Sequence, residues 1–469
     1  MNTRTLHLLA LTVGLFCATS VLPARSLADR LQRLLSEPVL ARSEVGIAVY
    51  DLTAGTPVFG WQDKKLYRPA SVEKLITAIT ALDCLGADYT LNTELFATGR
   101  LDSGGTLHGD LWVRGGFDSE FGEADMQRLA DLAREAGIRR IEGSIRGDVS
   151  MKDSLYYGQG WSWDDARYDF QPCLSPLMYR KGCVRVTVRP GSRGAKPQVA
   201  VSPVSSFYTV ANEAVSRMPE AGRLTVTRDW MYQGNEIRVT GNADRTLSRD
   251  IPLFGSEHYF LYVFAERLQQ AGIATAGYDR GGVVPDGARL LGRVERPLAD
   301  VLRQALKESD NLSAEALFYH VGRRLRPDRP VGAADAVEMI GGKITALGRD
   351  PEAYSIADGS GVSLYNYVSP DLLLAFLVHA HGCPAVFDAL WEALPVAGVD
   401  GTLAHRMKDT PAHRRVRAKT GTVTGVSSLA GYARAADGHL LAFVIINQNV
   451  LRGREARAFQ NKVCVELCR

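Results

Sequence analysis

Three short motifs in this 469-residue chain carry residue types suited to nucleophilic acyl transfer. They are Ser71–Lys74 (Ser-Val-Glu-Lys), Ser309–Asn311 (Ser-Asp-Asn) and Lys419–Gly421 (Lys-Thr-Gly). A serine hydroxyl is a poor nucleophile until a nearby base removes its proton, and a partly desolvated lysine can act as that base. Each motif alone arises easily by chance, but the three in this order predict an enzyme with a serine nucleophile.

The first motif places a serine and a lysine one helical turn apart. Ser71 follows Pro69-Ala70 and opens an apolar run with helical spacing, so we predict that it lies at a helix N-terminus, where backbone N–H groups point outward. Lys74 then projects from the same face as the Ser71 hydroxyl. We expect Ser71 to be the nucleophile, Lys74 its general base and Glu73 a surface residue. Taken alone, the motif would equally fit an N-cap serine with a solvated lysine.

The second motif falls between two helical stretches, 297–307 and 312–325. In the functional interpretation Ser309 relays a proton to the leaving amine, while Asn311 binds the substrate amide and orients Lys74. Asp310 is expected to hold the loop. Helix capping alone would also explain this run of residues.

The third motif lies on a predicted strand with one free edge, to which an extended peptide can add. Lys419 would supply charge near Ser309, and Thr420 and Thr422 could hydrogen-bond a terminal carboxylate. Gly421 would let the peptide approach closely. We expect the backbone N–H groups of Ser71 and Thr422 to form an oxyanion hole.

The strands that must position these motifs come from opposite ends of the chain. A hairpin is predicted over 45–60, and a second one over 428–446 turns at Asp437-Gly438. Together with the Lys419 strand they would form a five-stranded antiparallel sheet. The catalytic domain is therefore predicted to be discontinuous, with segments 29–90 and 290–469.

The middle of the chain has a different pattern. Alternating polar and apolar residues with Gly/Pro punctuation predict a β-rich domain over 184–241. Strand and helix patterns on both sides predict an α/β domain in two segments, 91–183 and 242–289. We expect this inserted span to fold on its own and to leave a catalytic core that contains all three motifs.

The N-terminal stretch 1–28 is typical of a secretory signal peptide, with Arg4 before an apolar run and small residues at Ser26 and Ala28. Cleavage is expected after Ala28, or else after Ser26; an uncleaved membrane anchor is the alternative. No other segment approaches the length of a membrane span, so no anchor is expected after cleavage. The formal charge is +3 and no dense Lys/Arg cluster occurs, which gives no indication of nucleic-acid binding.

Six cysteines would remain after removal of the signal peptide, an even number that permits disulfides in an exported chain. Cys173 and Cys183 flank a short loop and are the preferred pair. No metal site or cofactor is predicted, because the nine histidines include no H-E-x-x-H motif. The pair His379 and His381 is interpreted as a solvated helix end.

With these motifs the chain resembles the low-molecular-mass class C penicillin-binding proteins, the D-alanyl-D-alanine carboxypeptidase/endopeptidase (DacB-like) family. Further stretches support the resemblance across the mature chain: 160–163, 358–363 with Asn366, 369–370, 394–403 and 431–432. The resemblance implies an α+β, penicillin-binding/serine β-lactamase-like transpeptidase fold with a helical subdomain and two inserted domains. One departure lies at 115–119, where relatives usually carry Gly-Asp-Pro; it concerns a turn and not the chemistry.

The resemblance also implies a function. The enzyme would be a periplasmic serine-type D-Ala-D-Ala carboxypeptidase, and also a D,D-endopeptidase, that trims peptidoglycan stem peptides through an acyl-enzyme on Ser71. β-Lactams would acylate the same residue. A β-lactamase is one alternative, although no deacylating glutamate is evident; a non-catalytic cell-wall binding protein with the same fold is another. The stem-peptide preference and the oligomeric state are left open.

Overall fold

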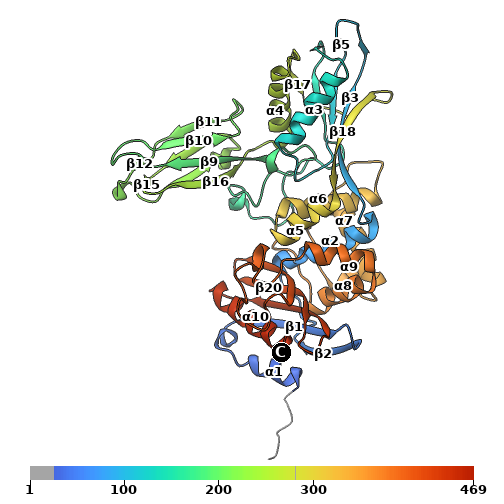
Figure 1. Ribbon diagram of the computed structural model, residues 1–469, viewed down its shortest axis with the longest axis vertical. Coiled ribbons are helices and arrows are strands. Elements are labelled where there is room, and N and C mark those ends of the chain that lie inside the picture. The colour runs from blue at the N-terminus through green and yellow to red at the C-terminus, as the bar shows by residue number, and fades with distance from the viewer. Residues whose placement is uncertain (1–25, 280) are drawn as a thin grey trace, which may run out of the picture.

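The computed structural model describes residues 26–279 and 281–469, so the predicted signal peptide lies almost wholly outside the described residues. The molecule is elongated, with a sheet and helices at one end, a second sheet at the other and a narrow β module projecting sideways (Figure 1). Of the described helices, no single one is long and apolar enough to cross a membrane. Helices α8 (Pro370–Gly382) and α9 (Pro384–Ala393) meet that test only as a pair, which is bent by 115°.

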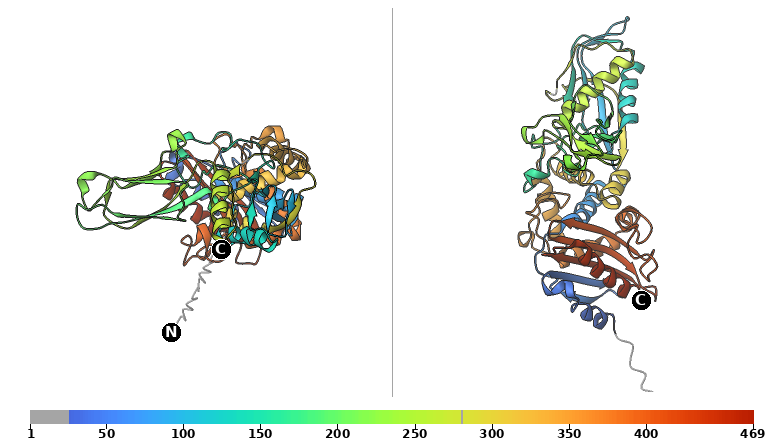
Figure 2. Two further views of the ribbon diagram at one scale, coloured as in Figure 1. Left: turned by 90° about the horizontal axis from the view of Figure 1, so that it is seen from above. Right: turned by 90° about the vertical axis from the view of Figure 1, so that its left-hand side faces the viewer.

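The predicted five-stranded antiparallel sheet is confirmed, with strand order β19-β20-β21-β1-β2. N-terminal and C-terminal strands lie side by side in it (Figure 2, right). Helices α1 and α10 cover one face, and α8 and α2 lie on the other. Because both faces are covered, β21 is a nearly continuous apolar run. The strands are β1 Glu44–Asp51, β2 Thr56–Trp61, β19 Val416–Val423, β20 Val426–Arg434 and β21 Leu440–Gln448.

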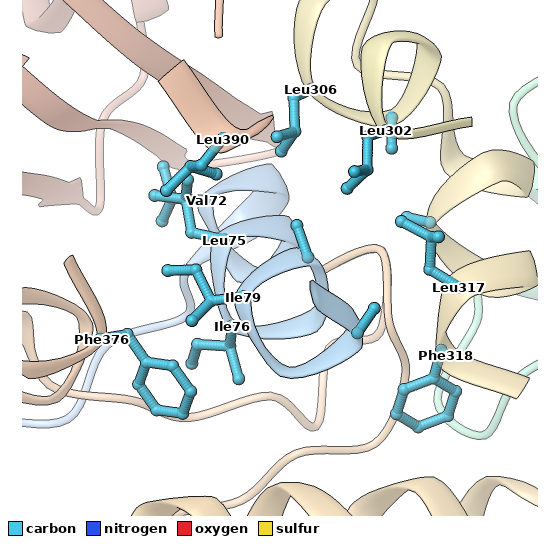
Figure 3. Close-up of a cluster of buried hydrophobic side chains, with 14 of the residues drawn as sticks. Val72, Leu75, Ile76, Ile79, Leu302, Leu306, Leu317, Phe318, Phe376 and Leu390 are labelled. Atoms are coloured by element: carbon cyan, nitrogen blue, oxygen red, sulfur yellow. The ribbon is translucent and has the colours of Figure 1, made fainter. Parts of the chain in front are cut away.

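A helical subdomain surrounds α2, which is buried on almost all sides along its first ten residues. Side chains of α2 and the turn before it point toward α5, α6, α8 and α9 (Figure 3). The helices of this subdomain are α2 Glu73–Leu85, α5 Leu298–Lys307, α6 Asn311–Leu325, α7 Ala333–Ala346, α8 Pro370–Gly382 and α9 Pro384–Ala393. The helices on the other face of the sheet are α1 Leu27–Leu34 and α10 Gly453–Leu467.

A second five-stranded sheet, ordered β17-β8-β6-β3-β18, forms the far end of the molecule with helices α3 and α4. Its elements are β3 Thr90–Ala97, β6 Leu111–Arg114, α3 Glu123–Glu135, β8 Ile145–Asp148, α4 Ser256–Gln270, β17 Tyr278–Asp279 and β18 Arg289–Pro297. A small accessory sheet contains β4 Arg100–Leu101, β5 Thr106–His108 and β7 Arg140–Ile141.

The predicted domain boundary between residues 289 and 290 falls inside the far sheet, since β18 pairs with β3 along its whole length. Residues 290–297 therefore belong to the far sheet. The sequence did not mark the boundary because β18 runs directly into α5 without turn residues between them.

The β module contains two three-stranded sheets, β10-β9-β16 and β11-β14-β13, and the two-stranded sheet β12-β15, none of which pairs with the catalytic sheet. The boundary predicted at 241 also falls short, because β16 pairs with β9 and extends the module to Pro252. The strands are β9 Cys183–Arg189, β10 Gln198–Ser202, β11 Thr209–Asn212, β12 Val215–Ser216, β13 Thr225–Arg228, β14 Glu236–Thr240, β15 Asn242–Ala243 and β16 Leu247–Pro252.

Candidate active site

Ser71 lies in a single 3-10 turn, Ala70–Val72, that leads directly into α2. Ala70 has a φ of 50°, a left-handed conformation that is uncommon for a residue with a side chain and is frequent at functional sites. The carbonyl of Pro69 accepts a hydrogen bond from the Ser428 hydroxyl of β20 at 2.6 Å. The nucleophile turn is therefore tied to the catalytic sheet at its start.

Lys74 is 1% exposed and donates to three oxygen atoms. Its Nζ lies 2.9 Å from Ser71 Oγ, 2.7 Å from Asn311 Oδ1 and 2.6 Å from the carbonyl oxygen of Ser360. Burial lowers the pKa of Lys74 to about 8, an effect that nearby carboxylates, Asp358 first, only partly offset. A lysine with this pKa supplies a substantial fraction of neutral amine close to neutral pH, as a general base requires.

Asp310 and Asn311 start helix α6, and each has a separate task. The Asp310 carboxylate caps the helix by accepting from the Ser313 backbone N–H at 2.8 Å, and it also pairs with Lys181 at 3.1 Å. Asn311 turns its Oδ1 to Lys74 and donates through Nδ2 to the carbonyl of Phe170 at 2.9 Å.

Ser309 and Lys419 form the second hydrogen-bonded pair of the site. Lys419 is fully buried, and its Nζ lies 2.7 Å from Ser309 Oγ and 2.7 Å from the carbonyl of Thr420. Burial, and then the charge of Lys74, lower the pKa of Lys419 well below its usual value. Ser309 has a φ of 63°, so its hydroxyl is held toward Lys419 by a strained backbone.

Strand β19 lies close against the nucleophile turn at Gly421. A Cβ at this position would come within 2.1 Å of Ser428 Oγ and 2.9 Å of the Ser71 backbone nitrogen. Thr422, the next residue, is exposed, and its hydroxyl donates to the Gly421 carbonyl at 2.8 Å. The Thr420 hydroxyl contacts that of Thr402 at 2.8 Å. The structure thus brings all eight predicted site residues into one region, at the junction of sheet and helical subdomain.

The loop 358–366 belongs to the site, although its residues were not among the predicted site residues. Its Ser360 carbonyl is the third acceptor of Lys74. The Asp358 carboxylate holds the loop by accepting from the backbone N–H groups of Gly361 and Ser363, the amide of Asn366 and the indole N–H of Trp161. The sequence signal for this loop is the run Asp-Gly-Ser-Gly at 358–361.

The expectation that Glu73 lies on the surface is wrong, because its side chain is 0% exposed. Glu315, one helix away, is also buried and accepts from the Gly359 backbone N–H at 3.1 Å. Burial, and then the Asp358 charge, raise the pKa of Glu315 to about 8 and that of Glu73 well above its usual value. The buried carboxyl groups of Glu73 and Glu315 therefore favour the neutral form, and both lie near enough to Lys74 to affect its pKa.

The predicted Cys173–Cys183 disulfide is wrong, since both residues are free thiols, as are the other four described cysteines. The two thiols have separate partners. Cys173 Sγ lies 3.3 Å from the Tyr157 hydroxyl, and Cys183 donates to the Lys181 carbonyl at 3.4 Å. Burial raises the pKa of both thiols.

The His379 end of α8 is less solvated than predicted, because it takes part in a cluster with Asp83 and Cys383 whose ligand atoms lie within 4.8 Å of one another. The ammonium of Lys343 lies 2.6 Å from Asp83 Oδ2 and 2.7 Å from His379 Nε2. It supplies the positive charge that a metal ion would otherwise bring, so the cluster is an ion-paired group at a helix end.

Comparison with known proteins gives a consistent result. The model of the D-Ala-D-Ala carboxypeptidase 3 (S13) family matches residues 27–467. A D-alanyl-D-alanine carboxypeptidase of an Actinomadura species is 30% identical over 468 residues, which cover 94% of this chain and 84% of that relative. The D-alanyl-D-alanine carboxypeptidase DacB of Haemophilus influenzae is 27% identical over 87% of this chain and 86% of its own length.

Solved structures share the fold. Penicillin binding protein 4 (dacB) from Haemophilus influenzae superposes with a TM-score of 0.81 at 24% identity, covering 94% of this chain and 98% of that one. Its complex with a novel β-lactam gives a TM-score of 0.76. The predicted fold class, with its five-stranded antiparallel sheet, is confirmed by this likeness.

Proposed function

The chain belongs to the D-Ala-D-Ala carboxypeptidase 3 (S13) family, and on that basis we propose that it is a serine D-Ala-D-Ala carboxypeptidase that trims peptidoglycan stem peptides. The observation that carries the proposal is the buried Lys74 amine, which lies 2.9 Å from Ser71 Oγ and whose other hydrogen bonds go to an amide oxygen and a backbone carbonyl. An amine in this position is suited to take the serine proton.

In the proposed reaction, Ser71 Oγ attacks the carbonyl of the penultimate D-alanine while Lys74 takes its proton. The backbone N–H groups of Ser71 and Thr422 stabilise the resulting oxyanion. Ser309, hydrogen-bonded to Lys419, passes a proton to the leaving amine, so the C–N bond breaks and D-alanine departs. Water then attacks the ester of the acyl-enzyme and releases the shortened peptide.

Lys419 and the two threonines of β19 have a binding role in this proposal. Thr420 and Thr422 place hydroxyl groups beside the strand edge, where they can hydrogen-bond the terminal carboxylate, with the charge of Lys419 behind them. Gly421 keeps the strand close enough to Ser71 for the substrate backbone to lie along it.

Further parts of the proposal concern substrates and location. A D-alanyl cross-link presents the same scissile carbonyl, so we include D,D-endopeptidase activity. β-Lactams would acylate Ser71 as mimics of the substrate. Penicillin binding protein 4 from Haemophilus influenzae, which shares the fold, has been solved in complex with a β-lactam. A peptidoglycan substrate requires export, and we propose a periplasmic location after removal of the signal peptide.

The test is digestion of purified pentapeptide muropeptides with separation of the products by mass. The wild-type enzyme should release D-alanine, and Ser71→Ala should release none while unfolding at the same temperature. Rapid turnover of penicillin without D-alanine release would indicate a β-lactamase. A folded wild-type protein that neither releases D-alanine nor becomes labelled would be a binding protein.

A further inference from the structure

Two of the three oxygen atoms around Lys74 Nζ take no part in the proposed chemistry. Asn311 Oδ1 and the Ser360 carbonyl, at 2.7 and 2.6 Å, direct the amine toward Ser71 Oγ. Since a displacement of about 1 Å can cost about a hundredfold in rate, the groups that hold these two acceptors matter for catalysis.

The Ser360 carbonyl is held through Asp358. The Asp358 carboxylate is 1% exposed and accepts at 2.8 Å from the indole Nε1–H of Trp161, a residue between β8 and β9. The loop lies so close to the nucleophile turn that a Cβ at Gly361 would come within 2.0 Å of the Ala70 carbonyl oxygen. A small shift of the loop would therefore move the Ser360 carbonyl relative to both Ser71 and Lys74.

The Asn311 side chain is held by the same region of the chain. Its Nδ2 donates to the Phe170 carbonyl at 2.9 Å, which fixes the amide orientation that presents Oδ1 to Lys74. The opposite orientation would direct an NH₂ group at the lysine ammonium and lose both hydrogen bonds.

The segment 159–171 that carries both contacts is itself fastened across the site. The Ser363 hydroxyl donates to the Gln159 carbonyl at 2.7 Å, and the Leu364 N–H donates to the Gly160 carbonyl at 3.2 Å. The segment closes on itself through Gln171 Nε2, which donates to the Ser162 carbonyl at 2.9 Å. It thus spans the distance from the 358–366 loop to the start of α6.

We propose that two contacts made by segment 159–171, through the Trp161 indole and the Phe170 carbonyl, position the catalytic base, with Trp161 as the principal positioning residue. Trp161 acts through Asp358 on the Ser360 carbonyl, and Phe170 acts through its own carbonyl on Asn311. The inference rests on the proposed function of Lys74 as the base. If Trp161 and Phe170 position Lys74 in this way, residues outside the three motifs contribute to the acylation step.

The test compares two tryptophans of the same segment in the full-length enzyme. Trp161→Phe keeps the ring but removes the N–H that binds Asp358. Trp163→Phe is the matched control, because Trp163 is 71% exposed and its ring packs at a tilt against Trp230, away from Asp358. The readouts are the rate constant of acylation by benzylpenicillin, the apparent dissociation constant that precedes it, and the pH dependence of the rate.

Trp161→Phe should lower the acylation rate constant by about tenfold to a hundredfold with little change in the apparent dissociation constant. The midpoint of its pH profile should move to lower pH, because the ammonium loses a well-placed carbonyl acceptor. Asp358→Asn should change both readouts in the same direction but further, because it also disturbs the other hydrogen bonds of the loop and removes a charge that raises the pKa of Lys74. Adding Trp161→Phe to Asp358→Asn should change little further. Trp163→Phe should behave as wild type.

Equal rates for Trp161→Phe and Trp163→Phe would overturn the inference, as would a lower rate with an unshifted pH midpoint, which indicates a purely structural role. D-Alanine release by the wild type, measured in parallel, tests the proposed function separately. A wild type that penicillin acylates but that releases no D-alanine would contradict only the proposed substrate. A wild type that is never acylated would overturn both.

Discussion

Lys74 donates to three oxygen atoms and to no carboxylate among the described residues, so burial dominates its protonation and lowers its pKa to about 8. The base must be neutral, and its neutral fraction rises as the pH passes through that value. The acylation rate should therefore increase about tenfold per pH unit below pH 8 and level off above it.

Stopped-flow measurement of penicillin acylation between pH 6 and 9.5 checks this expectation. In Lys74→Ala the rate should fall by about 10²–10⁴-fold, the usual contribution of a positioned proton acceptor. A wild-type rate that is flat across this range, or a Lys74→Ala variant as fast as wild type, would mean that the base is another group.

Glu315 provides a second prediction at the residue scale, because burial raises its pKa from an ordinary 4.5 to about 8 in the folded state. The folded protein then binds the proton more tightly than the unfolded chain. The stabilising contribution is fully present below about pH 4.5 and is lost as the pH rises toward 8. Glu315→Gln removes this titration.

The free energy of unfolding, measured with urea at pH 5 and pH 8, tests the prediction. The free energy of unfolding of the wild type minus that of Glu315→Gln should be smaller at pH 8 than at pH 5. The same difference between the two proteins at both pH values would show that Glu315 does not titrate in this range.

At the scale of elements, strand β19 reaches the nucleophile turn only because residue 421 has no side chain. Gly421→Ala would place a Cβ 2.9 Å from the Ser71 nitrogen and 2.1 Å from Ser428 Oγ, so the strand must move outward. We expect acylation to fall by about a hundredfold while the fold is retained.

A matched control is Gly342→Ala in α7, where nothing lies within 4 Å of the added Cβ. This variant should keep the wild-type rate. Both variants can be compared by fluorescent-penicillin labelling over time, with thermal unfolding as the check on folding. Wild-type labelling by Gly421→Ala would show that the strand does not need this close approach.

The elements also show what the sequence could predict. The hairpin patterns and the three motifs were enough to predict the catalytic sheet and the site residues beside it, because each of these signals lies within a short stretch of sequence. Trp161 and Asp358 were not predicted as partners, since their hydrogen bond joins residues 197 positions apart. Glu73 was predicted to lie on the surface because charged residues usually do. Helix α2 is instead buried on nearly every side, and its sequence gives no sign that the face with Glu73 is covered.

At the scale of the whole molecule, we propose that the span from β3 to β18, both strands included, is inserted into the catalytic domain. The two parts share a core, because Phe117, Leu174 and Met178 of the span pack with the helices around α2. The span also supplies Trp161 and Phe170 to the surroundings of Lys74. Removing it should therefore affect the chemistry as well as substrate handling.

A deletion of 98–288 tests this expectation. Ala97 pairs with Arg289 across the two strands, so an Asn-Gly turn can close them into a hairpin. The shortened chain keeps all three motifs, and if circular dichroism shows it folded, penicillin should label it more slowly than wild type by at least about tenfold. Labelling at the wild-type rate would show that the catalytic part positions Lys74 unaided.

Mass spectrometry of the full-length protein after incubation with benzylpenicillin shows whether Ser71 forms the acyl-enzyme. We expect one penicilloyl group per chain, located by peptide mapping on Ser71 and absent from Ser71→Ala. An adduct on another serine, such as Ser360, or an equal adduct on Ser71→Ala would contradict it.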